Sequence, residues 1–537
     1  MTENSNHVDR LGDFTTTTRT LRIAAMAAVV GAIGAVVAWI LVRLIQGITA
    51  LAYFHTLSAS GLPPSANKLG LWAVLVPIVG GVIVGFVARF GSEKIRGHGI
   101  PEAMEAILIG RSRLSAKVAV LKPTASAIAI GTGGPFGAEG PIIMTGAAFG
   151  SVFAQAFHLS DVERKTLLVA GASAGMAAIF SAPVAAVLLA VELLLFEWKP
   201  SSLIPVAVAA TIGAALRVPL LGGGAVFPVT PHEALPILGL VAALAVGIIA
   251  GFAATLVTKL CYACEDAFAK MPIHWMWWPA IGGVVVGIGG LFAPRALGVG
   301  YDVISDLFAG NLIAGAAAAL LIAKAIMWAF ALGSGTSGGV LAPLLIMGGA
   351  IGAIESSVIP GHDPGLWAMI SMAAMMGGTM RAPLTAIVFL LELTHDINLL
   401  PALLIACVAS HAVTVLILRR DILSEKVARR GHHVNREYVV NPLAQFRVAQ
   451  VMHPPLDASG TLRTVLADND EELAVAYPDE LLDEAMTRLI LNGSDQIPVV
   501  NRNDGSTVIG VIDADAIAMA WHDRHAKENI REKGSAE

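Results

Sequence analysis

Charged side chains are scarce in this chain of 537 residues, of which 14% are charged and 55% are hydrophobic. Soluble domains carry about 25% charged residues. The composition therefore excludes an ordinary soluble protein and predicts a polytopic membrane protein with a soluble end. The formal net charge of −5 indicates no particular partner because the acidic residues gather in the tail, and we expect no nucleic acid among the partners.

Cysteine is also rare, with three in the chain. Cys261 and Cys264 form a C-x-x-C within an apolar run without a second pair, and Cys407 stands alone in another apolar run. This pattern favours helix packing over metal or redox chemistry, so we expect no metal site. The H-E-x-x-H pattern of a zinc protease does not occur either.

Uninterrupted hydrophobic runs that are long enough to cross a membrane are few. A span needs about 20 apolar residues, and the runs at 23–53, 69–88, 235–257 and 398–418 meet this length. Many others are shorter and broken by Gly or Pro. We therefore predict an all-α polytopic membrane protein in which several helices are short, tilted or broken. The first run is too long for a signal-peptide core and is interpreted as a retained helix.

Basic residues cluster at 89–96, 111–122 and 419–430, and the last cluster leads into a polar tail. Basic flanks favour the cytoplasmic side, so we expect both termini in the cytoplasm and the chain in the cell (inner) membrane. The predicted divisions are an N-terminal segment 1–20, a membrane domain 21–430 with halves of about 21–230 and 231–420, a linker 431–446, a small α/β domain 447–525 and a tail 526–537.

One acid, Glu139, is the only charged side chain between Lys122 and Asp161. It lies in a glycine-rich break, GTGGPFGAEGP at 131–141, with apolar sequence on both sides. A charge at membrane depth costs about 2.5–3.5 kcal/mol on insertion scales and marks a pathway. Non-helical backbone at that depth is tolerated only inside protein or around water. The segment therefore predicts an ion or proton site.

The membrane part contains an internal repeat. The break at 131–141 is matched by GSGTSGGVLAP at 333–343, and Ala-Pro followed by Glu192 is matched by Ala-Pro followed by Glu392, with offsets of 202 and 200 residues. Interrupted hydrophobic segments at corresponding places in two halves indicate a transporter-type site near the bilayer midplane. The counterpart of Glu139 is Leu341, so one half supplies the only acid.

These segments resemble the signature loops of the CLC family of chloride channels and transporters. GHGIP at 97–101, GAEGP at 137–141 and GVLAP at 339–343 have the order and spacing of that family, and 171–193 and 424–431 are similar to it as well. The resemblance covers about residues 20–431. It implies a homodimer of inverted repeats in membrane lipid, with one anion pathway per subunit, chloride as the default anion and no enzymatic activity.

The resemblance also implies site residues. Glu139 matches the gating glutamate, and the anion-binding positions fall at His98, Gly99, Ile100, Pro101, Gly137, Ala138, Gly140, Val340, Leu341 and Leu423. Helix N-termini supply free N–H groups and a partial positive charge, and the three signature segments contain no Lys or Arg. An anion would therefore bind weakly enough to leave. We expect unprotonated Glu139 to compete with the anion and protonated Glu139 to swing aside.

Several positions depart from the family pattern. The second acid of proton-coupled members falls at Leu193, which cannot relay protons. Channel-like or weakly coupled flux is therefore favoured, and proton/anion exchange is the alternative. The neighbouring Glu192 is matched in the second half, which favours a structural role. The usual serine is His98, the usual aromatic is Leu341 and the usual tyrosine is Leu423, so we expect an anion preference that responds to pH through His98.

The polar tail has a strand-like stretch at 448–452, a helix-like stretch at 481–491 and strands at 497–500 and 508–512. It resembles a single CBS motif. The usual Thr or Ser of that motif falls at Asp513 and the usual Asp at Ala516. We therefore expect no adenine nucleotide or other cofactor, and a role in folding or dimer contact.

One enzyme hypothesis competes with transport. GASAG at 171–175 matches the G-x-S-x-G pattern of hydrolase nucleophiles, so Ser173 with His411 could form an intramembrane serine hydrolase. The flanks are apolar and helix-like, whereas that pattern needs a strand before the serine, and small residues often serve close helix packing in membranes. A third class, a sensor built on the soluble domain, has no need for Glu139.

Overall fold

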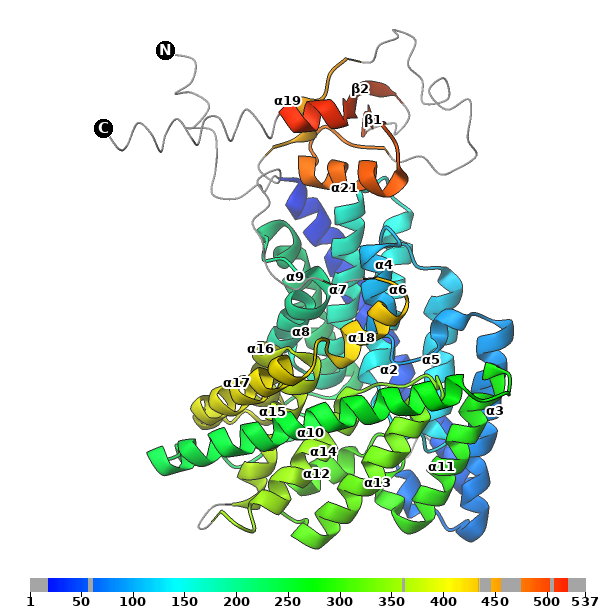
Figure 1. Cartoon of the computed structure of the whole chain (residues 1–537), viewed down its shortest axis with the longest axis vertical. Coiled ribbons are helices and arrows are strands. Elements are labelled where there is room, and N and C mark those ends of the chain that lie inside the picture. The colour runs from blue at the N-terminus through cyan, green and yellow to red at the C-terminus, as the bar shows by residue number, and fades with distance from the viewer. Residues whose placement is uncertain are drawn as a thin grey trace. The chain divides into compact units, whose positions relative to one another are not determined.

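A computed structural model describes residues 18–56, 61–359, 363–432, 434, 446–454, 475–502 and 507–519. This part of the chain is mostly helical (Figure 1). It divides into two compact units: a helical unit of residues 16–154 and 165–436, and a smaller unit that contains the tail from residue 437. The predicted N-terminal segment 1–20, linker 431–446 and tail 526–537 lie wholly or mostly outside the described residues.

The helical unit contains two series of helices in the same order. The first series is α2 (Arg19–Phe54), α3 (Leu75–Phe90), α4 (Ile100–Leu108), α5 (Ala116–Gly131), α6 (Glu139–Gln155), α7 (Asp161–Phe180), α8 (Pro183–Leu189) and α9 (Pro200–Leu221). The second is α10 (Ile237–Ala269), α11 (Trp278–Phe292), α12 (Tyr301–Phe308), α13 (Ala314–Gly333), α14 (Leu341–Glu355), α15 (Pro364–Met380), α16 (Pro383–Thr394) and α17 (Leu400–Ile417), after which α18 (Ile422–Arg429) follows.

Short irregular helices join these elements. A π-helical turn, η4 (Ala190–Leu195), extends α8. The 3₁₀ turns are η1 (Pro64–Ala66), η2 (Gly70–Val74), η3 (Glu93–Ile95), η5 (Trp275–Trp277), η6 (Pro294–Ala296) and η7 (Ile397–Leu399).

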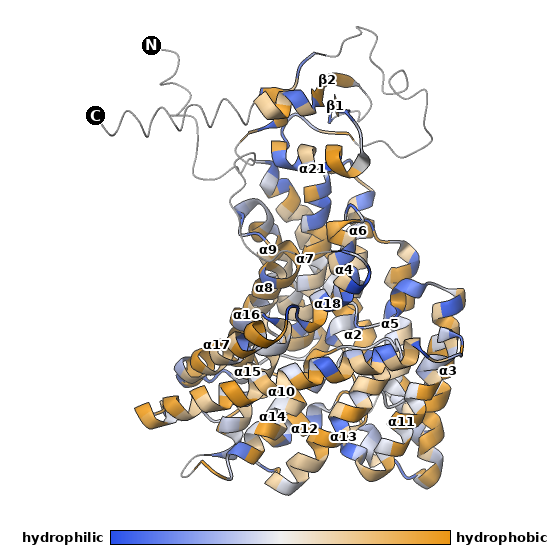
Figure 2. Ribbon diagram, viewed as in Figure 1, coloured by the Kyte–Doolittle hydropathy of each residue, from blue (hydrophilic) through white to orange (hydrophobic). Residues whose placement is uncertain are grey.

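Seven helical segments in the described part are long and apolar enough to cross a membrane. Shorter apolar helices accompany them at Pro183–Leu195, Leu341–Glu355 and Pro383–Thr394. Figure 2 shows hydrophobic residues distributed along the long helices α10, α11 and α17. The prediction of an all-α polytopic membrane fold with short and broken helices is confirmed.

The repeat is visible in the packing as well as in the helix order. Helix α2 packs against α9 in the way that α10 packs against α17, and α3 crosses α11. At that crossing Gly81 lies against the carbonyl of Pro279, and Gly283 lies against the carbonyl of Pro77. A side chain on either glycine would collide with the opposite backbone, so the crossing needs small residues, as is common for helix pairs in membranes.

The tail unit is small. Its strands β1 (Gln496–Val500) and β2 (Val508–Asp513) pair antiparallel, and its helices include α19 (Val448–Val451) and α21 (Leu482–Asn492). The predicted helix at 481–491 and the strands at 497–500 and 508–512 are confirmed. The prediction of a strand-like 448–452 is wrong, because this stretch closes a helical turn in which the N–H of Met452 donates to Val448 O at 2.8 Å.

Candidate functional site

Two glycine-rich breaks meet inside the helical unit. The break at 132–138 separates α5 from α6, and the break at 334–340 separates α13 from α14. They bond to each other, since Gly137 N–H donates to Gly339 O at 3.4 Å and Gly339 N–H donates to Gly137 O at 3.0 Å. All residues of both breaks are buried. The interrupted segments of the two halves therefore face each other, as the repeat predicts.

Glu139 is the first residue of α6, and its side chain is fully buried. Its carboxylate lies against the α-carbons of Gly137 and Gly339, where an added methyl group would collide with it. Among the described residues neither carboxylate oxygen has a hydrogen-bond partner of normal geometry. The Ala342 N–H in the first turn of α14 and the Lys324 ammonium act on it electrostatically. A buried acid without a hydrogen-bond partner of normal geometry is costly and calls for a functional explanation.

The loop before α4 brings His98 to the start of α6. Gly99 adopts a φ of 94°, which favours glycine. A Cβ on Gly99 would lie 2.7 Å from Gly140 O, so the two backbones touch. His98 is 4% exposed, and its Nδ1 has no hydrogen-bond partner in the described part of the chain. The N–H of Gly99 is already taken by the Glu102 carboxylate at 2.9 Å.

Leu423 is fully buried in the first turn of α18, which packs against α4. The Asp421 carboxylate caps this helix by accepting from Leu423 N at 2.7 Å and from Ser424 N at 3.1 Å. The α18 N-terminus therefore has its first N–H groups engaged. The far end of α18 is held to α4, because Arg430 pairs with Glu102 at 2.7 Å.

The remaining predicted positions fall in the first turns of these helices or beside them. Ile100 and Pro101 begin α4, Ala138 and Gly140 flank the first residue of α6, and Val340 and Leu341 begin α14. The starts of α4, α6 and α14 are thus brought together around Glu139 and Gly140, whereas Leu423 joins through the contact of α18 with α4.

Two buried lysines in matching places were not predicted from the sequence. On α5, Lys122 Nζ donates to Ile95 O at 2.8 Å and to Gly97 O at 2.7 Å. On α13, Lys324 Nζ donates to Ala296 O at 3.0 Å and to Gly298 O at 2.9 Å. Each half therefore uses an ammonium to hold the loop before its short helix. The sequence did contain a sign of this pair, because both lysines interrupt apolar runs and lie 202 residues apart, as the repeat predicts.

Glu192 and Glu392 have a reciprocal structural role. Glu192 lies in the π-helical turn η4 and accepts from the N–H of Thr385 at 2.9 Å, at the start of α16. Glu392 lies on α16 and accepts from the N–H of Ala185 at 2.8 Å, at the start of α8. Each acid caps the helix of the other half. The neighbouring Leu193 is fully buried and offers no ionisable group.

The structure around Ser173 does not have the geometry that the serine hydrolase alternative needs. Ser173 lies within the continuous helix α7 and is fully buried, whereas a nucleophile elbow places the serine on a turn after a strand. Among the described residues no group of three His, Cys, Asp or Glu side chains could hold a metal ion. Cys264 instead packs against Gly333, where α10 meets α13.

In the tail unit, Asp513 is engaged by its own neighbours. Its carboxylate accepts from the N–H of Ala516 at 2.7 Å and contacts His453 Nε2 at 2.8 Å. These contacts act on both groups: the Ala516 N–H lowers the pKa of Asp513, and the Asp513 carboxylate raises the pKa of His453. The Asp513 carboxylate therefore stabilises this unit through its own neighbours.

Comparison with known proteins places residues 79–415 in a family described as voltage gated chloride channel. A voltage-gated ClC-type chloride channel ClcB from Citrobacter koseri is 30% identical over 378 residues, which cover 68% of this chain and 88% of that protein. An H(+)/Cl(-) exchange transporter ClcA from Cronobacter sakazakii is 29% identical over 408 residues, covering 73% of this chain and 85% of that protein.

Solved structures share the fold. A slow cyanobacterial Cl-/H+ antiporter matches with a TM-score of 0.67 at 22% identity, over 77% of this chain and 98% of that chain. A CLC-type fluoride/proton antiporter matches with a TM-score of 0.62 at 19% identity, over 74% of this chain and 97% of that chain. At these identities the likeness concerns the fold alone.

Proposed function

The chain belongs to the voltage-gated chloride channel family, and from this premise we propose that it carries small anions, chloride first among them, through one pathway per subunit that Glu139 gates. Anion transport is the activity of that family. That Glu139 gates this transport is a more specific proposal. It is supported by one observation above all: a fully buried carboxylate without a normal hydrogen-bond partner, at the place where the N-termini of α6 and α14 meet.

The mechanism follows from competition for the same donors. First-turn N–H groups of α4, α6 and α14 lack helical partners and carry partial positive charge. Ionised Glu139 occupies the space beside Gly137 and Gly339 that an anion would need. Protonation removes its charge and its claim on these donors, so the side chain leaves and the anion takes its place. Because the three segments themselves contain no Lys or Arg, the anion is released readily.

The decisive variant is Glu139→Gln, which keeps the shape and removes the charge. We expect chloride efflux from liposomes to become independent of pH between about pH 4.5 and 7.5, the range in which a carboxyl group in protein can titrate. Glu355→Gln is the matched control, because Glu355 is also a buried acid, 7% exposed, at the opposite end of α14. If the flux of the Glu139→Gln protein depends on pH as that of the wild type does, Glu139 is not the gate.

Coupling to protons is the finer question within this function. Leu193 is fully buried at the place where proton-coupled members carry an acid, so we propose channel-like or weakly coupled flux. One relative is named a channel and another an exchange transporter, and exchange is the alternative. Opposed chloride and proton gradients separate the two, since the reversal potential of a channel follows chloride alone, while that of an exchanger shifts with the proton gradient.

We further propose that the chain works as a homodimer, with the tail and both termini in the cytoplasm. Exposed apolar side chains on α8, α9, α16 and α17, among them Val184, Ile204, Leu384 and Leu404, support a face that contacts lipid or a second copy. Light scattering of the detergent-solubilised protein tests the dimer. Cleavage of an engineered site after residue 430 in sealed vesicles tests the side of the tail. We propose that this function needs no cofactor.

A further inference from the structure

The repeat pairs the loop before α4 with a loop that no signature motif marks. Gly97-His98-Gly99 precedes α4, and Gly298-Val299-Gly300 precedes α12, at an offset of 201 residues. All four glycines have positive φ, at 79° and 94° in the first loop and 66° and 79° in the second. Each loop is bonded to the glycine-rich break of the other half, since Gly97 N donates to Gly335 O and Gly298 N donates to Gly133 O.

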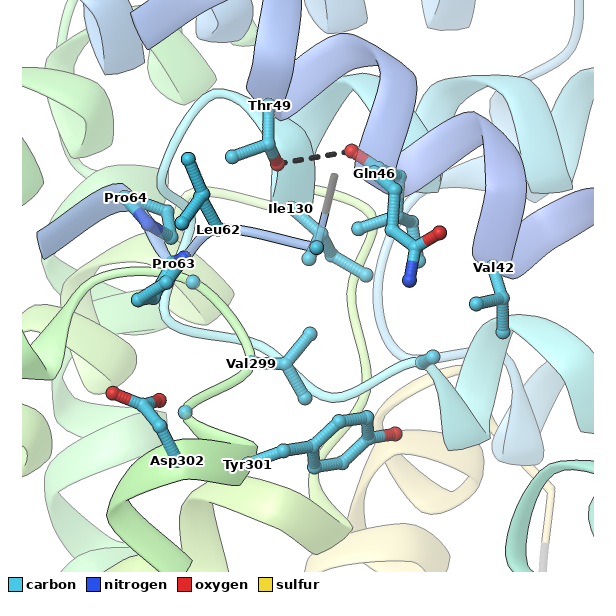
Figure 3. A pocket seen from close by; sticks show the side chains of 15 residues that line it. Val42, Gln46, Thr49, Leu62, Pro63, Pro64, Ile130, Val299, Tyr301 and Asp302 are labelled. Atoms are coloured by element: carbon cyan, nitrogen blue, oxygen red, sulfur yellow. Dashed lines mark hydrogen bonds between the residues drawn. The ribbon is translucent and has the colours of Figure 1, made fainter. Parts of the chain in front are cut away.

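The second loop lines a cavity of about 170 Å³. Helix α2 forms one wall through Gln46 and Thr49, and Gly298–Asp302 forms the other. Figure 3 shows Gln46 and Thr49 across the cavity from Tyr301 and Asp302. The cavity reaches Ala138, the residue before Glu139, but Glu139 itself does not line it. It is therefore a separate chamber that adjoins the proposed gate.

Tyr301 lines this chamber and carries a donor that the described residues do not use. Its hydroxyl oxygen is buried and has no hydrogen-bond partner among the described residues. The ring is held edge-on by Phe180 and Phe227, with centroids 6.4 Å and 6.0 Å away. A hydroxyl placed by packing and left unsatisfied is poised for a ligand that accepts hydrogen bonds. The first helical bond of α12 runs from Ile304 N to Gly300 O, so the N–H groups before Ile304 are also free of helical partners.

The charges around the chamber favour a weakly held anion. The Lys324 ammonium donates to the carbonyl oxygen of Gly298, which lines the chamber. In the described part of the chain no carboxylate lies within 4.0 Å of this ammonium. Asp302 is exposed and opposes an anion at the mouth. The buried cation is opposed by Asp302 and by Glu139, which both act on it. The attraction for an anion is therefore weak, which suits a site that must release its ligand.

We propose that this cavity between α2 and the start of α12 is an additional binding site for a small monovalent anion, with Tyr301 as its hydrogen-bond donor. It is the counterpart, in the second half, of the anion-binding loop that contains His98. The proposal rests on the proposed anion pathway. It adds a site that reaches Ala138, next to Glu139, where an anion waits before Glu139 moves.

Direct binding tests the site independently of transport. Crystals of the full chain soaked in bromide should show an anomalous peak beside the Tyr301 hydroxyl, and Tyr301→Phe should lose it. Thr49→Val is the matched control within the same cavity, because the Thr49 hydroxyl already donates to Ile45 O at 2.9 Å. This control should keep the peak. Bromide beside Glu139 and α4 but not in the cavity would overturn the inference and leave the proposed function standing.

Transport gives a second measurement with effects in two directions. In liposomes the half-saturating chloride concentration should rise about three- to tenfold in Tyr301→Phe, since water replaces part of the lost hydrogen bond. It should fall about two- to fivefold in Asp302→Asn, which removes a repulsive charge at the exposed mouth without disturbing the core. Equal half-saturation in both variants and the wild type would overturn the site. A cavity peak in a protein without chloride flux would support the site and sink the proposed function.

Discussion

The two halves of the helical unit share a backbone plan but differ in the chemistry that they place on it. Both contain a broken helix pair, a lysine that holds the loop before a short helix, and an acid that caps the other half. Only the first half places an acid in the break, at Glu139, where the second has Leu341. The shared features build the scaffold, and we propose that the unshared acid, Glu139, controls the flux. On this proposal, a charge that is repeated in both halves is structural and a charge that is present in one half is functional.

Giving the second half its own acid should have the largest effect. In Leu341→Glu two carboxylates would face each other across the junction of α6 and α14, where Leu341 is fully buried. Like charges at such a place resist simultaneous ionisation, and one ionised group would always obstruct the anion. We expect chloride flux at pH 7.5 to fall about tenfold or more and to recover near pH 5. Leu341→Gln is the neutral control. Equal flux of the Glu and Gln variants at both pH values would show that position 341 does not face the pathway.

The two buried lysines should be equivalent in stabilising the fold but different in their effect on Glu139. Either Lys122→Met or Lys324→Met leaves two buried carbonyls without a donor, at about 1–3 kcal/mol each. We therefore expect a similar loss, of about 2–6 kcal/mol, in the free energy of unfolding of both variants. Chemical denaturation of the detergent-solubilised protein measures this loss.

The two lysines should differ in their effect on the proposed gate, Glu139. Lys324 acts on Glu139, whereas the carboxylate that acts on Lys122 is Glu102. Only Lys324→Met should therefore move the pH dependence of flux, toward higher pH, since losing a nearby cation favours the protonated form of Glu139. The same shift in Lys122→Met would contradict the asymmetry.

The reciprocal caps should give smaller and equal effects. Glu192→Gln and Glu392→Gln each weaken the cap of one short helix, which is worth about 0.5–2 kcal/mol. Because the caps lie at separate helix starts, the double variant should lose about the sum of the two. Thermal unfolding monitored by circular dichroism tests this. A change in the pH dependence of flux for Glu192→Gln alone would restore a gating role for that acid.

The smallest effect is expected at His98, which has no counterpart in the second half because Val299 occupies the matching place. His98→Ser supplies the hydroxyl that family members usually carry, so we expect nitrate-to-chloride selectivity to change about two- to fivefold, within the range of one hydrogen bond. His98→Asn keeps a polar group that does not titrate and serves as control for pH. Unchanged selectivity and pH response in both variants would place the His98 side chain outside the anion path.

Much of this architecture follows from the sequence alone. The glycine-rich breaks, the isolation of Glu139 and the repeat all depend on local composition, so they are visible without a structure. The contact of Gly137 with Gly339 follows from the repeat, because matched interrupted segments face each other. The double glycines of α3 and α11, at 80–81 and 282–283, carried a signal for close helix crossing that small-residue patterns could have revealed.

Other features depend on how distant segments pack. Nothing local to Glu192 indicates that its carboxylate caps α16, since the partner N–H lies 193 residues away in the chain. In the sequence the loop before α12 shares only a Gly-x-Gly with the loop before α4. The matched backbone angles and lysine contacts establish the likeness. The short helix at 448–451 has a strand-like composition, and the N–H groups of Val448 and Ala449 donate to the carbonyls of Glu480 and Pro478, which lie about 30 residues away in the chain.

The exchange of caps between α8 and α16 also bears on how the protein is made. During synthesis the first half emerges with Glu192 facing no helix start and with α8 lacking its cap, because both partners lie in the second half. Neither half is complete until the other arrives. A chain that ends after the first half would therefore leave α8 without its cap and Glu192 without the N–H groups that it accepts from in the complete fold.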